Sequence, residues 1–380
     1  MVTPVDIKYS YRGTEWHIYE YAKYLRQHGI DAQLLVTENI RNYTPMPKYK
    51  TIASTYKMIP KTEVRCKEYV LPFKWHLFKY KNLPKDAPIY FPYSIYDYIY
   101  NIFTKPKGQK YIIGCHGMHL KMGKIIDSKL LEGLLNFCIK TVLNVKKDET
   151  KDLYFHTLNS EQARDINRVF SPKSDHIFTI PSMIDTSTYK MATNNSDKFK
   201  ILHIGGPDKG MDVVLDVISI LMGKGELNKF EFYFIGECNV SIKQGYNYKN
   251  VHFLSTVNEE KKMHLLMSSD AIIIPAYEAF PKTMLEGIAS GIYVITSRRN
   301  AGWSDVVDHG VKINVVHAGE PLEYIKPLLS LAKQKHNSKK IFDELRRKNR
   351  KIAEREFDKS RVLKQVTNMF ERVIKDCEMQ

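Results

Sequence analysis

Short apolar runs alternate with stretches of helical periodicity along most of the chain. A continuous apolar run of about four to eight residues predicts a buried strand, whereas apolar positions three or four apart predict a helix. In the first half, the pattern predicts strands at 32–37, 88–91, 110–114, 153–157 and 176–180, and helices at 15–28, 127–143 and 160–169. In the second half, it predicts strands at 199–204, 231–235, 251–254, 271–274 and 293–296, and helices at 210–222, 259–267, 283–289 and 322–332. This alternation is typical of parallel α/β sheets.

Two such arrays follow one another, which predicts two Rossmann-like domains that face each other across a cleft. A chain of 380 residues is also too long for a single hydrophobic core. We assign residues 1–190 to the first domain and 191–359 to the second, with the polar stretch 192–198 as the hinge. Residues 1–4 read as the end of a strand that is either very short or begins upstream.

The C-terminal segment is charged and helical in pattern, with a break at Phe357-Asp358 and Ser360 as the expected cap of the last helix. Apolar residues of this helix recur at a spacing of three or four: Val362, Val366, Phe370 and Val373. Such a stripe must be covered by other parts of the protein. We therefore expect the helix at 360–380 to pack back on the first domain.

Composition narrows the class of protein. Hydrophobic residues make up 43% of the chain, but no run is long enough to span a bilayer and no signal peptide is visible at the N-terminus. The five cysteines are scattered and form no Cys-x-x-Cys pair, which argues for a reducing compartment and against structural zinc. We expect a cytoplasmic protein.

The net charge is +16, and most of the excess lies in the first half of the chain. Such a field attracts an anionic membrane face or a polyanion, although a general lysine bias explains it equally well. Residues 43–108 also break the alternation with many aromatic and lysine residues, as in 71–81. That mixture suits a peripheral membrane surface, base stacking on nucleic acid, or a partly buried connection with solvated lysines.

Two carboxylates with seven residues between them, Glu278 and Glu286, are the strongest chemical signal. Glu278 follows the apolar strand at 271–275, and Glu286 lies in a short helix that starts near Pro281. A helix start behind a strand offers free backbone N–H groups and a positive dipole end, which suit a phosphate or diphosphate. Carboxylates on either side can accept hydrogen bonds from sugar hydroxyls, so the layout predicts a nucleotide-sugar site.

Several motifs occur in the order found in one known family: Arg12-Gly13-Thr14-Glu15, Gly114-Cys115-His116-Gly117, Ile180-Pro181-Ser182-Met183-Ile184-Asp185, Ile204-Gly205-Gly206-Pro207-Asp208-Lys209-Gly210, and Glu278 to Glu286. Together they resemble the retaining nucleotide-sugar glycosyltransferases of family 4, which have the two-domain GT-B fold. The resemblance covers nearly the whole chain and is strongest from about residue 200 to 315. It implies that the first domain binds the acceptor and the second binds the donor.

The resemblance also implies roles for single residues. Lys209 would bind the diphosphate, Glu286 the ribose hydroxyls, and Glu278 the transferred sugar. His116 would lie at the sugar, and Gly13 would let the backbone approach the phosphates. The remaining implied donor-binding residues surround these groups or offer backbone N–H groups to the distal phosphate: Gly205, Gly206, Phe280, Pro281, Thr283, Met284 and Leu285. No Asp-x-Asp occurs, so neither a metal nor another cofactor is expected.

The chain departs from the family at Gly206, where an arginine usually stands; Arg298 or Arg299 could supply the missing cation. The implied reaction moves a hexose from a UDP- or GDP-linked donor to an acceptor hydroxyl with retention. We expect a lipid-linked or cell-surface glycan as the acceptor, at the inner membrane face, in polysaccharide biosynthesis. Two alternatives are an inactive GT-B scaffold that binds anionic membrane or nucleic acid, and a glycosyltransferase that acts on nucleic acid.

Overall fold

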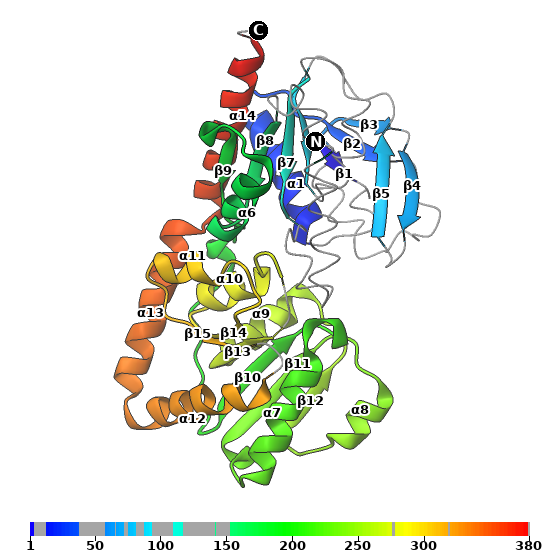
Figure 1. Cartoon of the computed structure of the whole chain (residues 1–380). Helices are drawn as coiled ribbons and strands as arrows, with labels where there is room; N and C mark the ends of the chain where they lie inside the picture. The colour runs from blue at the N-terminus through cyan, green and yellow to red at the C-terminus, as the bar shows by residue number, and fades with distance from the viewer. Residues whose placement is uncertain are drawn as a thin grey trace. The chain divides into compact units, whose positions relative to one another are not determined.

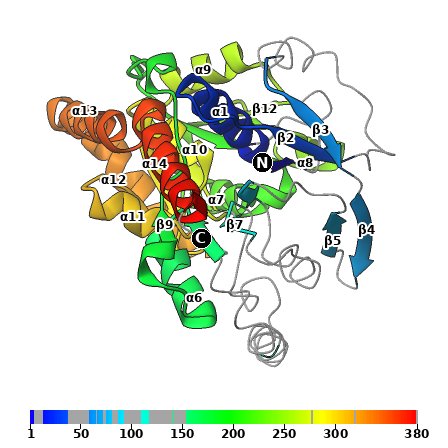
Figure 2. The same cartoon turned by 90° about the horizontal axis from the view of Figure 1, so that it is seen from above.

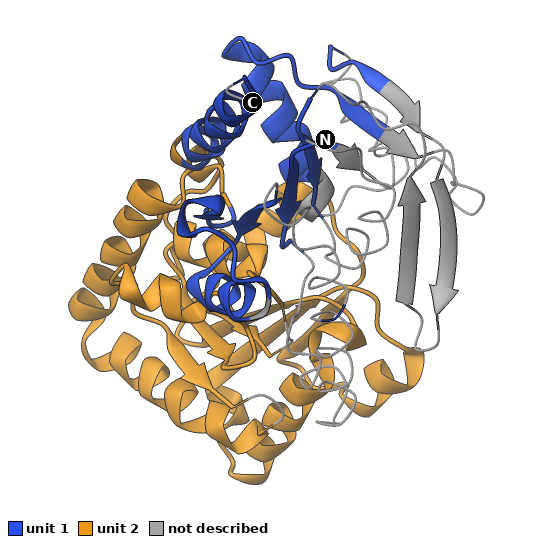
Figure 3. Ribbon diagram, turned by 45° about the horizontal axis from the view of Figure 1, so that its top comes forward, with its two compact units in different colours: residues 1–182, 362–380 blue, residues 183–361 orange. Residues whose placement is uncertain are grey.

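The computed structural model describes residues 1–3, 13–37, 58–64, 66–71, 75–80, 87–92, 109–116, 141, 153–275, 278–317 and 320–378. Nearly all of the predicted helix at 127–143 and much of the aromatic stretch within 43–108 lie outside these residues. The chain divides into two compact units (Figure 3): unit 1 comprises residues 1–182 and 362–380, and unit 2 comprises residues 183–361. Within the described residues, unit 2 has one parallel sheet and unit 1 has two, as expected for the alternating pattern.

Unit 2 has a six-stranded sheet in which every neighbouring pair is parallel. Its strands are β10 (Phe199–Ile204), β11 (Phe230–Ile235), β12 (Val251–Leu254), β13 (Ala271–Ile274), β14 (Tyr293–Ser297) and β15 (Asn314–Val316), in the order β12-β11-β10-β13-β14-β15. The first five were predicted from their apolar runs and are confirmed. The three residues of β15 were missed because so short a run gives little signal.

Helices cover both faces of this sheet (Figure 1). The apolar side chains of α7 (Met211–Gly223) and α12 (Pro321–Asn337) pack in one core with Phe199, Ile201 and Ile273. The other face carries α9 (Glu259–Ser268) and α10 (Lys282–Ala289), and Gly287 of α10 lies close to Ile272 and Val294. Three further helices complete the unit: α8 (Val240–Gly245), α11 (Trp303–Asp308) and α13 (Lys339–Glu356).

Unit 1 contains a parallel four-stranded sheet of β6 (Ile89–Phe91), β7 (Tyr111–Gly114), β8 (Leu153–Thr157) and β9 (Ile177–Thr179). A second parallel sheet joins β1 (Val2–Thr3), β2 (Leu34–Thr37) and β3 (Lys61–Val64). The described part of residues 43–108 adds an antiparallel pair, β4 (Cys66–Leu71) and β5 (Trp75–Tyr80). In the part of residues 1–182 that the structure describes, the helices that can be traced from end to end are α1 (Gly13–Gln27) and α6 (Ser160–Phe170).

The last helix, α14 (Lys359–Glu378), lies beside the β6–β9 sheet of unit 1 (Figures 1 and 2). Its apolar stripe is buried, and the Phe370 ring lies 5.8 Å from that of Tyr90. The expected cap is corrected, because the Asp358 carboxylate, not Ser360, accepts the first free N–H of the helix. No helix in the described part of the chain combines the length and apolar character that a membrane span requires.

The stretch at 192–198, expected to be the hinge, lies within unit 2. Asn194 is buried and donates to the carboxylate of Asp270 at 2.6 Å. The N–H of Ala192 donates to the carbonyl of Ser290 at 2.8 Å. The stretch is therefore hydrogen bonded to the body of this unit.

Candidate functional site

The unit 2 sheet reverses its strand order between β10 and β13. These strands are neighbours, although β11 and β12 lie between them in the chain. The chain runs outward from β10 on one side and later returns to place β13 on the other. In open α/β sheets, ligands bind beyond the carboxyl ends of the strands at such a switch point. The loops after β10 and β13 therefore form the candidate site.

The loop after β10 brings a lysine back over the end of its own strand. It runs through Gly205 and Gly206 into a short 3-10 turn, Pro207–Lys209, before α7 begins. Gly205 has φ +139°, a conformation that favours glycine, and a Cβ there would collide with Cβ and Cγ of Lys209. The glycine therefore allows Lys209 to fold over the strand end.

The loops after β10 and β13 meet in an ion pair. The Lys209 Nζ lies 2.8 Å from the Glu278 Oε1, and both side chains remain partly exposed. The structure thus brings together the two residues predicted to hold the diphosphate and the sugar. A cation and an anion at a partly open strand edge can be separated by a ligand that carries both phosphate oxygens and hydroxyl donors.

The position of Glu278 depends on Asn300, a fully buried residue that the sequence did not single out. The Asn300 Oδ1 accepts the backbone N–H of Glu278 at 2.9 Å, and its amide donates to Thr296 Oγ1 at 2.7 Å. Asn300 follows β14, the parallel neighbour of β13. The carboxyl ends of parallel strands lie at the same side of a sheet. An asparagine in the loop after β14 was therefore the available signal in the sequence that this residue lies near Glu278.

Glu286 is almost completely buried, and within the described part of the chain its carboxylate is contacted at Oε1. Lys262 Nζ of α9 lies 3.0 Å away, the Tyr189 hydroxyl donates at 3.1 Å, and Lys282 Nζ lies at 3.9 Å. Burial raises the pKa of Glu286, but the two lysines and these hydrogen bonds bring it below its ordinary value. Glu286 is therefore held as a carboxylate, with Oε1 fixed by groups from distant segments.

The other predicted donor-binding residues of this region contribute mainly to the interior of unit 2. Phe280 is buried beside Gly302, with its ring 6.1 Å from that of Phe357. The side chains of Met284 and Leu285 are also buried. Pro281 precedes α10, and Thr283 lies in its first turn. The N–H of Met284 already donates to the carbonyl of Pro281 at 3.1 Å, and Leu285 lies far enough into the helix for its N–H to have an intrahelical acceptor, so Thr283 is the predicted residue of this turn whose N–H could still meet an anion.

Gly13 and His116 belong to unit 1. Gly13 is the first residue of α1, and His116 follows β7. The His116 ring is buried among aromatic and histidine rings, with Nε2 2.9 Å from the Tyr90 hydroxyl and the His156 ring at 5.2 Å. Burial, together with the neighbouring histidines, places the pKa of His116 well below its ordinary value, so the ring is neutral.

The proposed substitutes for the missing arginine, Arg298 and Arg299, lie exposed after β14. The Arg298 guanidinium lies 3.4 Å from the His317 ring. Gly206, which stands at the usual arginine position, begins the turn that carries Lys209. Among the residues that the structure describes, no group of three or more His, Cys, Asp or Glu side chains could hold a metal ion.

Comparison with known proteins supports the fold more strongly than the chemistry. Residues 198–334 match the family model described as glycosyl transferases group 1. A 125-residue segment is 30% identical to the D-rhamnosyltransferase WbpZ of Pseudomonas aeruginosa, and this match spans 30% of the chain and 31% of that relative. Less than a third of the relative's length is therefore shared in this comparison.

Solved structures match over nearly the whole chain. A glycosyltransferase from Rickettsia africae aligns over 98% of this chain and 97% of its own, with a TM-score of 0.68 and 13% identity. Anabaena Alr3699/HepE, solved with UDP and glucose, aligns over 100% and 98%, with a TM-score of 0.63 and 13% identity. The predicted GT-B fold is confirmed. The narrower assignment to retaining family 4, with its paired-glutamate motif, stays a prediction.

Proposed function

We propose that this protein is a glycosyltransferase that moves a hexose from a nucleoside-diphosphate sugar to an acceptor hydroxyl. The observation that carries the proposal is the pairing of Lys209 with Glu278 at 2.8 Å, at the switch point of the unit 2 sheet. A phosphate-binding cation and a hydroxyl-binding carboxylate come there from the loops after adjacent strands. The family match over residues 198–334 covers both loops.

In the proposed mechanism, Lys209 and the start of α10 stabilise the negative charge that grows on the departing diphosphate. Such preorganised electrostatic stabilisation is usually the largest contribution to catalysis. Glu278 accepts hydrogen bonds from the sugar, and Glu286 from the ribose. We propose transfer with retention and without a metal, in which a donor phosphate oxygen takes the proton of the acceptor hydroxyl.

Support for the donor comes from the Anabaena structures with UDP and UDP-glucose, and support for a hexose comes also from the D-rhamnosyltransferase. The net charge of +16 supports a peripheral location on an anionic inner membrane face, with a lipid-linked or cell-surface glycan as acceptor. Gly206 in the arginine position favours a second candidate, a GT-B scaffold that binds the nucleotide without transferring the sugar.

A thermal-shift screen with UDP, GDP and their sugars tests donor binding. We expect one nucleotide series to raise the Tm, because a ligand present at a hundred times its Kd stabilises the folded state by about 2.7 kcal/mol. Lys209→Ala should reduce this shift, whereas Lys224→Ala, an exposed lysine at the end of α7, should retain it. No shift with any nucleotide would argue against both candidate functions.

The contacts of Glu286 predict how donor use depends on pH. In Lys262→Met the nearest cation, at 3.0 Å, is lost while the carboxylate stays buried. Burial then dominates, so the pKa of Glu286 rises and the group takes up a proton at a higher pH. Because a neutral carboxyl accepts hydroxyl hydrogen bonds less well, kcat/KM for the donor should fall at a higher pH on the acid side. A kcat/KM profile against pH measures this shift.

Lys261→Met is the matched control, because Lys261 is exposed in the same helix. Its acid limb should coincide with that of the unaltered protein. An unchanged acid limb in Lys262→Met would mean that ionised Glu286 is not required for donor use.

A further inference from the structure

A cavity lies at the amino ends of the strands of the same sheet, opposite the carboxyl ends where the candidate donor site lies. It is an open cavity of about 760 Å³ at the amino ends of β10 and β11, lined in part by Phe199, the first residue of β10, and by Lys229, directly before β11. β10 has six residues, and at ~3.3 Å per residue this end lies roughly 20 Å from the Lys209 loop. The cavity is therefore separate from the candidate donor site.

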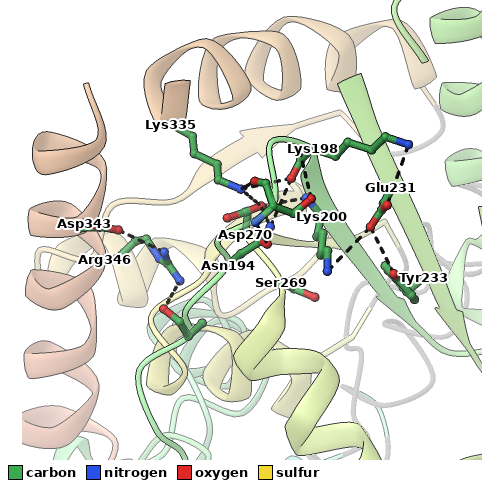
Figure 4. Close-up of polar contacts among 12 residues, drawn as sticks. Asn194, Lys198, Lys200, Glu231, Tyr233, Ser269, Asp270, Lys335, Asp343 and Arg346 are labelled. Atoms are coloured by element: carbon green, nitrogen blue, oxygen red, sulfur yellow. Dashed lines mark hydrogen bonds and ion pairs between the residues drawn. The ribbon is translucent and has the colours of Figure 1, made fainter. Parts of the chain in front are cut away.

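One lining residue of this cavity, Lys335, belongs to a buried ion pair with Asp270 (Figure 4). Asp270 is fully buried directly before β13, and its Oδ2 accepts from Lys335 Nζ at 3.0 Å and from Asn194 at 2.6 Å. Lys335 also donates to the carbonyls of Ser196 and Lys198. These bonds tie the 194–198 loop to α12, so this side of the cavity is preorganised and the charge of Lys335 is already neutralised.

The cavity is lined by basic side chains, and some of them form no ion pair with the residues that the structure describes. Six basic side chains line the cavity: Lys198, Lys229, Lys333, Lys335, His336 and Lys339. Within the described residues, the side chains of Lys333, His336 and Lys339 are exposed and have no hydrogen-bond or ion-pair partner. The only acidic side chains of the lining are Asp197 and Glu226, and Glu226 is paired with Lys229. An anion entering the cavity would therefore meet unpaired lysines.

The remaining lining has the character of a small-molecule site. Phe199, Leu329 and Ala332 form apolar wall, and Asn195 and Asn228 offer amide groups. The volume lies within the range of about 300–1,000 Å³ usual for ligand pockets. Lysine is a common phosphate binder and contributes as a point charge. Separated lysines next to apolar and amide side chains therefore suit a phosphate group that is attached to a larger molecule.

We propose that this lysine-rimmed cavity is a second anion site that binds a phosphate group, carried either by a soluble metabolite or by the headgroup of an anionic lipid. Lys333 and Lys339 supply the charge, and the Asp270–Lys335 pair keeps the cavity shaped for it. The site neither overlaps nor depends on the proposed donor site, so it would exist in a non-transferring scaffold as well.

The test variant is Lys333→Glu/Lys339→Glu, in which both changes fall on exposed side chains. The matched control is Lys340→Glu/Lys351→Glu, which changes the charge equally on exposed positions of α13 outside the cavity. Equilibrium dialysis with pyrophosphate isolates the second site when the donor site is saturated with the nucleoside diphosphate found in the thermal-shift screen and about 0.15 M salt suppresses nonspecific attraction. Unchanged Tm and unchanged binding of that nucleotide show that each variant is folded.

We expect pyrophosphate binding that the nucleoside diphosphate does not displace, and we expect it to weaken at least about tenfold in the cavity variant, because both charge-assisted contacts are lost. The control variant should bind normally. Vesicles of equal parts phosphatidylcholine and phosphatidylglycerol form the second arm. Vesicle binding that the cavity variant alone loses identifies a lipid headgroup, and pyrophosphate binding without vesicle binding identifies a soluble phosphate. Absence of both in the unaltered protein, or equal losses in both variants, would overturn the proposal.

Discussion

Replacing Lys209 by alanine is expected to lower the turnover of sugar transfer by at least about 100-fold, the scale on which one charge-stabilising contact acts in a transition state. Lys209 is the cation brought to the switch point by the Gly205 turn, and Gly206 stands where a second cation would be expected. The loss should therefore appear in kcat, because negative charge on the diphosphate grows only as the bond to the sugar breaks.

Glu278→Ala should reduce turnover by a similar factor, because the variant loses the carboxylate that accepts hydrogen bonds from the transferred sugar. Neither change should unfold the protein, since an ion pair with both side chains partly exposed contributes at most about 1 kcal/mol. The control Lys224→Ala removes an exposed lysine away from the site and should leave the rate unchanged. Steady-state assays with the donor found in the thermal-shift screen measure these rates. Near-normal rates in both site variants would remove the transfer assignment.

Local sequence signals predicted the parts of the site that lie in continuous segments. β10, the Gly205 turn and Lys209 follow one another, as do β13 and Glu278, so apolar runs and turn residues were sufficient to place them. The apolar pattern does not specify the strand order that makes β10 and β13 neighbours, so it could not predict the contact between Lys209 and Glu278. Only the family resemblance placed these two residues in one site.

The supporting contacts could not be predicted in the same way. Lys262, Tyr189 and Glu286 come together from three separate segments, and nothing in the periodicity of any one segment indicates the other two. His116 shows the opposite limit. Its place after a strand was predicted, but only the packing of unit 1 determines that its ring is buried against Tyr90.

The two ends of β10 and β13 differ in how they hold charge. At the carboxyl ends, Lys209 and Glu278 are partly exposed, so a ligand can separate them at little cost. At the amino ends, Asp270 is completely buried and Lys335 nearly so, and the pair is tied into the loop and helix around it. Because a buried pair is costly to break, the second pair is a structural element.

Replacing Lys335 by methionine is therefore expected to lower the free energy of unfolding by about 3–5 kcal/mol, since the change strands the fully buried charge of Asp270. Methionine keeps much of the aliphatic length, so lost packing contributes little. Lys333→Met is the matched control on the same helix, because Lys333 is exposed and pairs with no other side chain that the structure describes; the change should alter stability by no more than about 0.5 kcal/mol. Urea unfolding at equilibrium measures both.

The double variant Lys335→Met/Asp270→Asn separates the buried charge from other effects. With the carboxylate replaced by an amide, the oxygen can still accept from Asn194 or from the N–H of Lys200, which lies 2.8 Å from the carboxylate. The double variant should therefore be more stable than Lys335→Met alone, a coupling that independent sites do not show. If the double variant instead lost as much stability as Lys335→Met and Asp270→Asn lose separately, added together, the pair would contribute no mutual stabilisation. The surrounding loop would then hold the shape of the cavity.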